Sequence, residues 1–245
     1  MRIGLIGGTG SALLLPAARQ RSLATPWGPP SGPLLEWQEG AHELCFLHRH
    51  GPAGTIPPHR VNYRANVWAM QAAGVDWLIG INAVGGIHRD AIPGRLAFPD
   101  QLIDYSWGRA HSYEEGGEHA VRHVDFTHPV APALHAALVA AAQRAGIAHL
   151  PRGVYGVTQG PRLETAAEID RLERDGCDFV GMTAMPEAGL ARELGIDYAI
   201  CAVVVNPAAG RGAEIHAEIE RSLQAGIEAV QALLKALLAA TPGQS

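Results

Sequence analysis

Short apolar runs alternate with longer segments of helical periodicity along almost the whole chain, and this alternation restricts the fold more than any other feature. Several of the runs are continuously apolar, which is typical of strands buried on both faces of a sheet. Strands and helices that alternate at this spacing predict an α/β domain. We see no internal repeat and no linker-like stretch, so we expect a single domain over residues 1–245.

The predicted elements can be assigned by residue range. The strands are expected at Arg2–Gly7, Glu43–Arg49, Trp77–Ala83, Arg95–Ile103, Gly153–Gln159, Asp178–Met182 and Tyr198–Asn206. The helices are expected at Val61–Ala73, Ala131–Ala145, Leu163–Arg174, Pro186–Leu194 and about Ala213–Ala240. Two stretches lack a clear period. Thr25–Gly40 is rich in Pro and Gly and is expected to be a loop, whereas Asp104–Thr127 is expected to be a long surface excursion or a binding loop.

The composition argues against several classes of function. Hydrophobic residues make up 47% of the chain, which is enough for a sizeable core and excludes wholesale disorder. The formal net charge of −5 argues against a nucleic-acid binder, which normally carries a basic surface. Of the 19 basic residues only Lys235 is a lysine, and its Ala- and Leu-rich surroundings disfavour Schiff-base chemistry and a P-loop. The high share of arginine suits recognition of oxyanions, and codon bias is the alternative explanation.

Cysteine usage and the apolar segments indicate the compartment. The three cysteines, Cys45, Cys177 and Cys201, lie far apart in apolar surroundings, so we expect buried free thiols in a reducing compartment. The N-terminal segment lacks the pattern of a signal peptide, and no apolar run approaches the roughly 18 residues of a membrane span. We therefore expect a cytoplasmic protein without a membrane partner.

A glycine-rich turn, Gly7-Gly8-Thr9-Gly10, ends the first predicted strand. A dinucleotide-binding fingerprint would need a third glycine where the chain has Leu13, so that motif is excluded. Consecutive backbone N–H groups in such a turn can bind an anion, with the Thr9 hydroxyl beside them. A tight turn without a ligand is the alternative.

The second predicted strand ends in His48-Arg49-His50-Gly51. Alternation along the strand places His48 and His50 on one face and Arg49 on the other. A His-x-His pair can ligate a metal, but the other histidines lie mostly in the irregular stretch, so we expect no metal. Arg-His-Gly also resembles the signature of the histidine phosphatases, where it ends the first strand instead of the second. In either case Arg49 and His50 are candidate donors to a phosphate oxyanion.

Two later strands also end in small or polar residues. The segment Asn82-Ala83-Val84-Gly85-Gly86 follows the third strand, and Met182-Thr183-Ala184-Met185-Pro186-Glu187 opens a helix with a proline near its start. Thr183 suits either an N-cap or a hydroxyl that contacts an anion. Ligands of open α/β sheets bind at the carboxyl ends of the strands, so the convergence of these motifs predicts a ligand site at that edge.

Together these motifs resemble the trimeric purine nucleoside phosphorylases, and most closely their methylthionucleoside phosphorylase branch. The resemblance runs nearly end to end and implies a mixed, partly barrel-like sheet flanked by helices, assembled as a homotrimer with active sites near subunit interfaces. Its blocks, in the family order, are Ile6-Gly7-Gly8-Thr9-Gly10, Arg49-His50-Gly51, Ile56-Pro57-Pro58-His59-Arg60-Val61-Asn62-Tyr63-Arg64-Ala65-Asn66, Asn82-Ala83-Val84-Gly85, Gln159-Gly160-Pro161-Arg162-Leu163-Glu164-Thr165 and Met182-Thr183-Ala184-Met185-Pro186-Glu187.

The resemblance also implies a reaction and the residues that perform it. The family cleaves the N-glycosidic bond of a purine nucleoside with phosphate as co-substrate, and needs no metal or organic cofactor. By their place in the motifs, the phosphate-binding residues would be Thr9, Arg49, His50, Ala83 and Thr183. Met182 would pack under the ribose. His123 aligns with a residue that reaches the 5′ end of the ligand in the neighbouring subunit, and His119 and His128 are the alternatives.

Two residues indicate which purine base is accepted. Family members that act on 6-aminopurines present Asp-x-Asp after the last apolar strand, where this chain has Asn206-Pro207-Ala208. Members that act on hypoxanthine and guanine present Asn there and a Glu after Gly-Pro-x-aromatic. Glu164 stands in that Glu position, although Leu163 replaces the aromatic residue. An ionised Glu164 accepts a hydrogen bond from N1–H of a 6-oxopurine, and Asn206 can donate to N7 or O6, so these are the expected catalytic residues.

Ile219 is the residue expected at the 5′ end of the nucleoside, because it matches an apolar position of the methylthio branch. The ordinary nucleoside branch uses a histidine nearby, and His216 shares a helix face with Ile219. We therefore expect phosphorolysis of S-methyl-5′-thioinosine, as a step of purine salvage. The alternatives are inosine or guanosine, then methylthioadenosine. A histidine-phosphatase-like hydrolase and a nucleoside-binding module without turnover are more distant.

Overall fold

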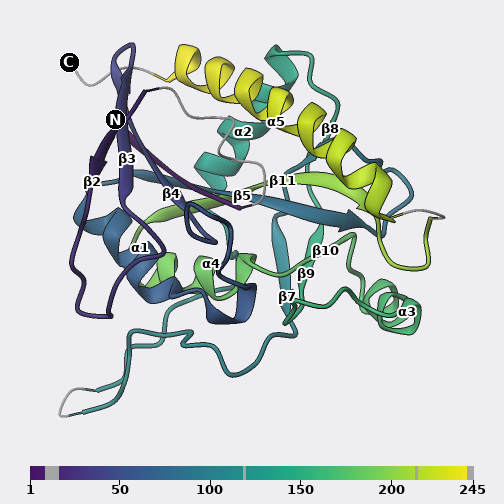
Figure 1. Cartoon of the computed structure of the whole chain (residues 1–245), viewed down its shortest axis with the longest axis horizontal. Helices are drawn as coiled ribbons and strands as arrows, with labels where there is room; N and C mark the ends of the chain where they lie inside the picture. The colour runs from purple at the N-terminus through teal and green to yellow at the C-terminus, as the bar shows by residue number, and fades with distance from the viewer. Residues whose placement is uncertain (9–16, 118–119, 213–214, 242–245) are drawn as a thin grey trace.

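The domain is built on one mixed sheet of eleven strands, as the computed structural model of the chain shows (Figure 1). The structure describes residues 1–8, 17–117, 120–212 and 215–241, and leaves out the side chains of residues 215–220. The main path of the sheet runs β2 (Arg19–Arg21), β3 (Leu34–Glu39), β4 (His42–His48), β1 (Arg2–Gly7), β5 (Trp77–Gly86), β10 (Phe179–Gly181), β9 (Val154–Val157) and β7 (Gln101–Asp104). The branch off β5 consists of β11 (Asp197–Pro207), β6 (Leu96–Ala97) and β8 (His149–Leu150).

The long strand β5 joins the two parts of the sheet. Its first half pairs in parallel with β1 as far as Ile81, and its last residues, Gly85 and Gly86, pair antiparallel with β10. Along its other edge it pairs in parallel with β11. The carboxyl ends of β1 and β10 therefore approach each other across residues 82–84 of β5. The expected α/β fold with a mixed, partly barrel-like sheet flanked by helices is confirmed.

Helices cover both faces of the sheet, as Figure 1 shows. One face is packed by α1 (Tyr63–Ala72) and α4 (Ala184–Glu193), and the opposite face by α2 (Pro132–Arg144) and α5 (Ile215–Ala240). The shorter α3 (Ala166–Arg174) packs beside β9 and β10. Each helix predicted from the sequence is present, with ends that differ by up to three residues. The three cysteines are buried free thiols, as expected.

The short strands β2 and β8 were not predicted from the sequence, and two longer stretches differ from their predicted assignment. The predicted strand Arg95–Ile103 is in fact β6 and β7, because Pro99 lies between them and cannot donate to a ladder. The two pieces then join different partners, β6 pairing with β11 and β8, and β7 with β9. The expected loop Thr25–Gly40 contains β3, which forms an antiparallel hairpin with β4. The turn residues therefore predicted the loop before Leu34 but not the strand after it.

The C-terminal helix also differs from expectation. Its last 20 residues, Arg221–Ala240, are long and apolar enough to cross a membrane by length and composition, which the sequence analysis did not foresee. In the fold, Val230, Leu233 and Leu237 are buried against the sheet and α2. Exposed residues of the same helix include Glu228 and Lys235. This is the arrangement of an amphipathic helix that packs one face on the domain and exposes the other.

Candidate active site

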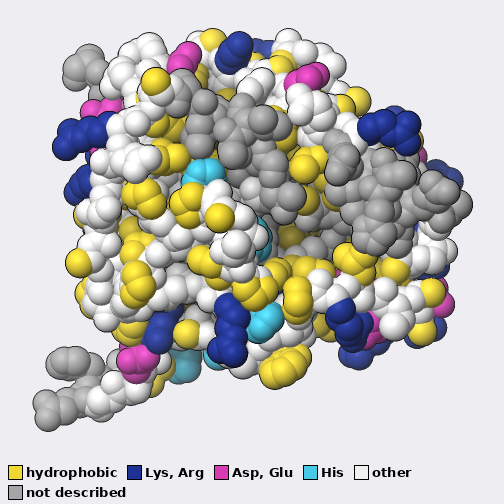
Figure 2. Space-filling view, viewed as in Figure 1, with side chains coloured by type: hydrophobic (Ala, Val, Ile, Leu, Met, Phe, Trp, Pro, Cys, Tyr) yellow, Lys and Arg dark blue, Asp and Glu magenta, His cyan; other side chains and the backbone are white. Residues whose placement is uncertain are grey.

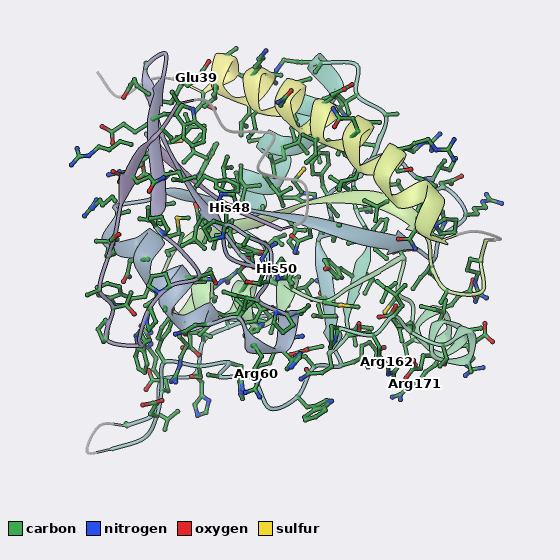
Figure 3. All side chains as sticks on the ribbon, in the orientation of Figure 1. Glu39, His48, His50, Arg60, Arg162 and Arg171 are labelled. Atoms are coloured by element: carbon green, nitrogen blue, oxygen red, sulfur yellow. The ribbon has the colours of Figure 1, made fainter. Side chains whose placement is uncertain are left out.

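A cavity of about 610 Å³ opens where the strands end. Seven of the ten predicted site residues line it, namely Arg49, His50, Ala83, Glu164, Met182, Thr183 and Asn206. They come from the carboxyl ends of β4, β5, β10 and β11 and from the loop before α3. The face in Figure 2 is hollowed near its centre, and Figure 3 places His50 near the middle of the molecule. The prediction that polar strand ends converge on one cavity is therefore confirmed.

The other three predicted residues are not among the described residues that line this cavity. Thr9 lies outside the described residues, and so does the side chain of Ile219. His123 is described and exposed, and it is not among the residues that line the cavity. It belongs to the irregular segment 105–127, which runs over the surface below α1 and α4 (Figure 1).

His50 lines the cavity and lies close to Gly8. Its Nδ1 lies 2.7 Å from the carbonyl oxygen of Ile56, so this nitrogen carries the proton in the neutral ring and donates it. Burial, and then the neighbouring Arg49, lower the pKa of His50. A Cβ at Gly8 would lie 3.5 Å from His50 Nε2 and 3.2 Å from Arg49 Nη1. The turn therefore brings backbone close to both side chains.

Arg49 is held by a buried carboxylate. Its Nε and Nη2 each donate to one oxygen of Glu187 at 2.9 Å, and both side chains are buried. Nη1 and Nη2 also donate to the carbonyls of Ile81 and Ile6. Burial by itself lowers the pKa of Arg49, but the Glu187 carboxylate more than offsets this, so the net pKa is raised. Among the described residues these bonds use four of the five N–H groups, and the fifth, on Nη1, has no described partner.

Glu187 is a residue that sequence reasoning did not single out, although it ends one of the motif blocks. Besides Arg49 it accepts a hydrogen bond from the Tyr198 hydroxyl at 2.9 Å. Burial, followed by the Glu187 charge, raises the pKa of Tyr198. The signal in the sequence was the need of a buried Arg49 for a counter-charge, but sequence alone does not indicate which carboxylate supplies it.

Thr183 presents a hydroxyl to the cavity. It occupies the N-cap position of α4, yet its side chain makes no capping hydrogen bond. Instead Asn82 Nδ2 donates to its Oγ1 at 2.6 Å. An oxygen that already accepts this bond is free to turn its own hydrogen toward a ligand. Of the two roles that the sequence left open, the geometry favours the anion-contacting hydroxyl.

The two candidate base-recognition residues, Glu164 and Asn206, also line the cavity. Glu164 Oε1 accepts a hydrogen bond from the Thr158 hydroxyl at 2.5 Å. Asn206 follows an irregularity in the pairing of β11 with β5, and its Nδ2 lies 2.5 Å from the Pro207 carbonyl. Leu163, which replaces the aromatic residue of the family, is half exposed at the rim.

Arg109 is the second residue that the sequence analysis missed. It comes from the long irregular segment and is almost fully buried. Its guanidinium donates to the carbonyls of Met182 and Met185 at 2.8 and 2.6 Å, and to those of Thr158 and Gln159 at 3.1 and 2.9 Å. It therefore ties together the ends of β9 and β10, from which the cavity residues follow. The sequence indicated a functional segment here, but not which of its residues turns inward.

In the part of the chain that the structure describes, no three His, Cys, Asp or Glu side chains gather to hold a metal ion. The His48–His50 pair thus lacks the further ligands that such a site requires. His48 also lines the cavity, and its ring packs edge-on against Phe46 with the ring centres 4.9 Å apart.

Comparison with known proteins assigns the family. Residues 2–239 match the model of the phosphorylase superfamily. A probable S-methyl-5′-thioinosine phosphorylase of Pseudomonas syringae pv. tomato is 49% identical over 97% of this chain and 98% of its own length. A 6-oxopurine nucleoside phosphorylase of Pyrococcus furiosus is 41% identical over 98% of this chain and 92% of its own. Among solved structures, a mutant adenosine/methylthioadenosine phosphorylase of Schistosoma mansoni in complex with methylthioadenosine superposes with a TM-score of 0.92. That pair is 29% identical, and the match covers 98% of this chain and 91% of the other.

Proposed function

The chain belongs to the phosphorylase superfamily, and from that premise we propose that it is a purine nucleoside phosphorylase that acts on S-methyl-5′-thioinosine. The products are hypoxanthine and 5-methylthioribose 1-phosphate. The names of its relatives support the 6-oxopurine nucleoside and the methylthio group. The observation that carries the proposal is that His50, Thr183, Glu164 and Asn206 all line one cavity at the ends of the strands.

Phosphate is held at the end formed by His50, Thr183 and the Nη1 of Arg49. A neutral His50 that donates through Nδ1 has a lone pair on Nε2, which accepts a hydrogen bond from the P–OH group of monohydrogen phosphate. The Thr183 hydroxyl, already accepting from Asn82, donates to a phosphate oxygen. Thr9 and the backbone at Ala83 complete the phosphate-binding residues.

The geometry suits cleavage of an N-glycosidic bond. Phosphate attacks C1′ from one face while the purine leaves from the other, through a transition state with positive charge on the ribose. An anion fixed beneath C1′ stabilises that charge and is also the nucleophile. Asn206 donates to N7 or O6 of the departing base, and Glu164 accepts from N1–H. Met182 packs under the ribose. No metal or organic cofactor takes part in these steps.

The 5′ methylthio group would lie beside α5. Leu223 of this helix lines the cavity, and Ile219 precedes it by one turn, so both belong to one face. An apolar pocket gains about 1–3 kcal/mol from a buried methylthio group and leaves a 5′-hydroxyl unpaired. His123 would reach the same end of the ligand in a neighbouring subunit of a homotrimer. We place this enzyme in purine salvage in the cytoplasm.

The deciding experiment measures base release from S-methyl-5′-thioinosine, inosine and methylthioadenosine, each with and without phosphate. We expect release only with phosphate and the highest kcat/KM for S-methyl-5′-thioinosine. Phosphate release from phosphomonoesters would instead support the hydrolase, and binding without turnover a nucleoside-binding module. Methylthioadenosine is the second candidate, because the solved structures that the fold resembles belong to enzymes named for that substrate. A preference for it would refute the assignment of Asn206 and Glu164.

A further inference from the structure

The carboxyl group of Glu164 is oriented by Thr158, which directly precedes the motif block that begins at Gln159. The Thr158 Oγ1 hydroxyl donates to Glu164 Oε1 at 2.5 Å, and the alternative acceptor, the Gly181 carbonyl, lies farther away at 3.3 Å. An O–H···O⁻ bond of that length is typical of a charge-assisted pair. No hydrogen bond to the other carboxyl oxygen is found within the described residues, and the side chain lines the cavity.

The donor in this pair is rigidly held. Thr158 follows β9 directly, and its backbone N–H donates to the Gly181 carbonyl of β10 at 2.8 Å. Its own carbonyl accepts from the buried Arg109 at 3.1 Å. Both backbone polar groups of Thr158 are therefore fixed by neighbouring segments, so the position of its hydroxyl is set by the sheet.

The loop that carries Glu164 is anchored on both sides of this residue. Thr165 caps α3 in a capping box with Glu168, and Arg162 makes two hydrogen bonds to the same Glu168 at 2.8 and 2.7 Å. Figure 3 shows Arg162 beside α3, at the outer side of this loop. The loop backbone at Glu164 is thereby anchored to the helix that follows, while the only described partner of its side chain is Thr158.

We propose that Thr158 is a positioning residue that fixes Glu164 in the orientation required for 6-oxopurines. The inference rests on the proposed function of the cavity. With Oε1 occupied by the hydroxyl, Oε2 is presented to the base as an acceptor, which suits N1–H of hypoxanthine. Adenine has a lone pair at N1, so the same orientation sets two acceptors against each other. Thr158 thus contributes to base selectivity without touching the base.

A purely structural role for Thr158 makes different predictions, so a set of variants separates the two. Thr158→Val keeps the shape and removes the donor, Thr158→Ser keeps the donor, and Thr158→Ala is a second deletion if the valine variant does not fold. Thr25→Val is the matched control, because it also removes a short hydroxyl-to-acceptor bond and Thr25 does not line the cavity. The measured quantities are kcat/KM for S-methyl-5′-thioinosine and methylthioadenosine, the inhibition constants of free hypoxanthine and adenine, and the KM of phosphate.

We expect Thr158→Val to lower the preference for the 6-oxopurine substrate roughly tenfold, the factor that corresponds to one lost hydrogen bond to a charged group. Inhibition by hypoxanthine weakens by a similar factor, whereas the KM of phosphate stays within twofold. Thr158→Ser restores the preference, and Thr25→Val leaves it unchanged. In a Glu164→Gln background, Thr158→Val has less than a twofold further effect, because the two residues act through one contact.

Three results would overturn the inference. The first is an unchanged substrate preference in Thr158→Val and Thr158→Ala. The second is an equal loss in the Glu164→Gln background, which would show that Thr158 does not act through the carboxylate. The third is a phosphate KM that rises as much as the hypoxanthine inhibition constant, which would indicate a general disturbance of the cavity. If Glu164→Gln itself leaves the preference unchanged, the base assignment in the proposed function fails as well.

Discussion

Removal of the Glu187 charge tests whether the cavity is built on a buried ion pair. Glu187 accepts three hydrogen bonds of 2.9 Å, two from Arg49 and one from the Tyr198 hydroxyl, and it is completely buried. Glu187→Gln keeps the shape but leaves the Arg49 guanidinium without a counter-charge. Breaking a buried pair on one side costs about 3–5 kcal/mol. For a chain of this length each kcal/mol lowers Tm by roughly 2–4 °C, so a fall of at least about 6 °C is expected.

The assay is thermal unfolding at fixed protein concentration, with Tyr198→Phe as a milder variant that removes one of the three bonds and keeps the charge. The double variant Arg49→Met/Glu187→Met should be more stable than Glu187→Gln, because it leaves no unpaired charge. A fall in Tm below about 2 °C for Glu187→Gln would refute the reasoning. The reasoning would also be refuted if the double variant lost as much stability as Arg49→Met and Glu187→Met lose in total, since the two residues would then be uncoupled.

Three further predictions follow from the same geometry. Gly80→Ala should lower the free energy of unfolding by about 1–3 kcal/mol, because its Cβ would collide with the Tyr198 hydroxyl oxygen. Urea titration should show that Tyr198→Phe partly suppresses this loss. His50 has a lowered pKa, so the folded chain binds fewer protons than the unfolded one and stability falls as pH drops below the ordinary value of 6.5. Urea titrations between about pH 5 and 7 should show that the free energy of unfolding falls less steeply with decreasing pH in His50→Gln than in the parent. Arg109→Met should raise the KM of phosphate and lower Tm, with Arg109→Lys intermediate, and an unchanged KM would assign Arg109 to stability alone.

The sequence predicted the architecture well wherever a local pattern decided it. Alternating apolar runs and helical segments were enough for the helices and for most strands. The break at Pro99 and the strands β2, β3 and β8 were missed, because each depends on which strand is the neighbour. Pro99 was visible in the sequence and is the one miss that turn chemistry could have corrected.

The candidate site shows the same division between local and distant information. Residues at strand ends, such as His50 and Thr183, could be assigned to the cavity from their motifs. The partners that orient them could not, because Glu187 is 138 positions from Arg49 and Thr183 is 101 positions from Asn82. Contacts at such separations are set by how helices pack on the sheet. Periodicity and motif spacing carry no information about them.

The two buried arginines, Arg49 and Arg109, differ in whether a carboxylate offsets their charge. Arg49 and Glu187 form a closed pair, so together they add little charge and mainly hold β4 against α4. Arg109 forms no ion pair with any carboxylate in the part of the chain that the structure describes, and its N–H groups meet carbonyls that include those of Met182 and Met185. A guanidinium solvated only by dipoles keeps its positive potential, and that potential decays slowly where water is excluded. Arg109 therefore remains a source of positive potential beside Met182 and Thr158, whereas most of the charge of Arg49 is offset by Glu187.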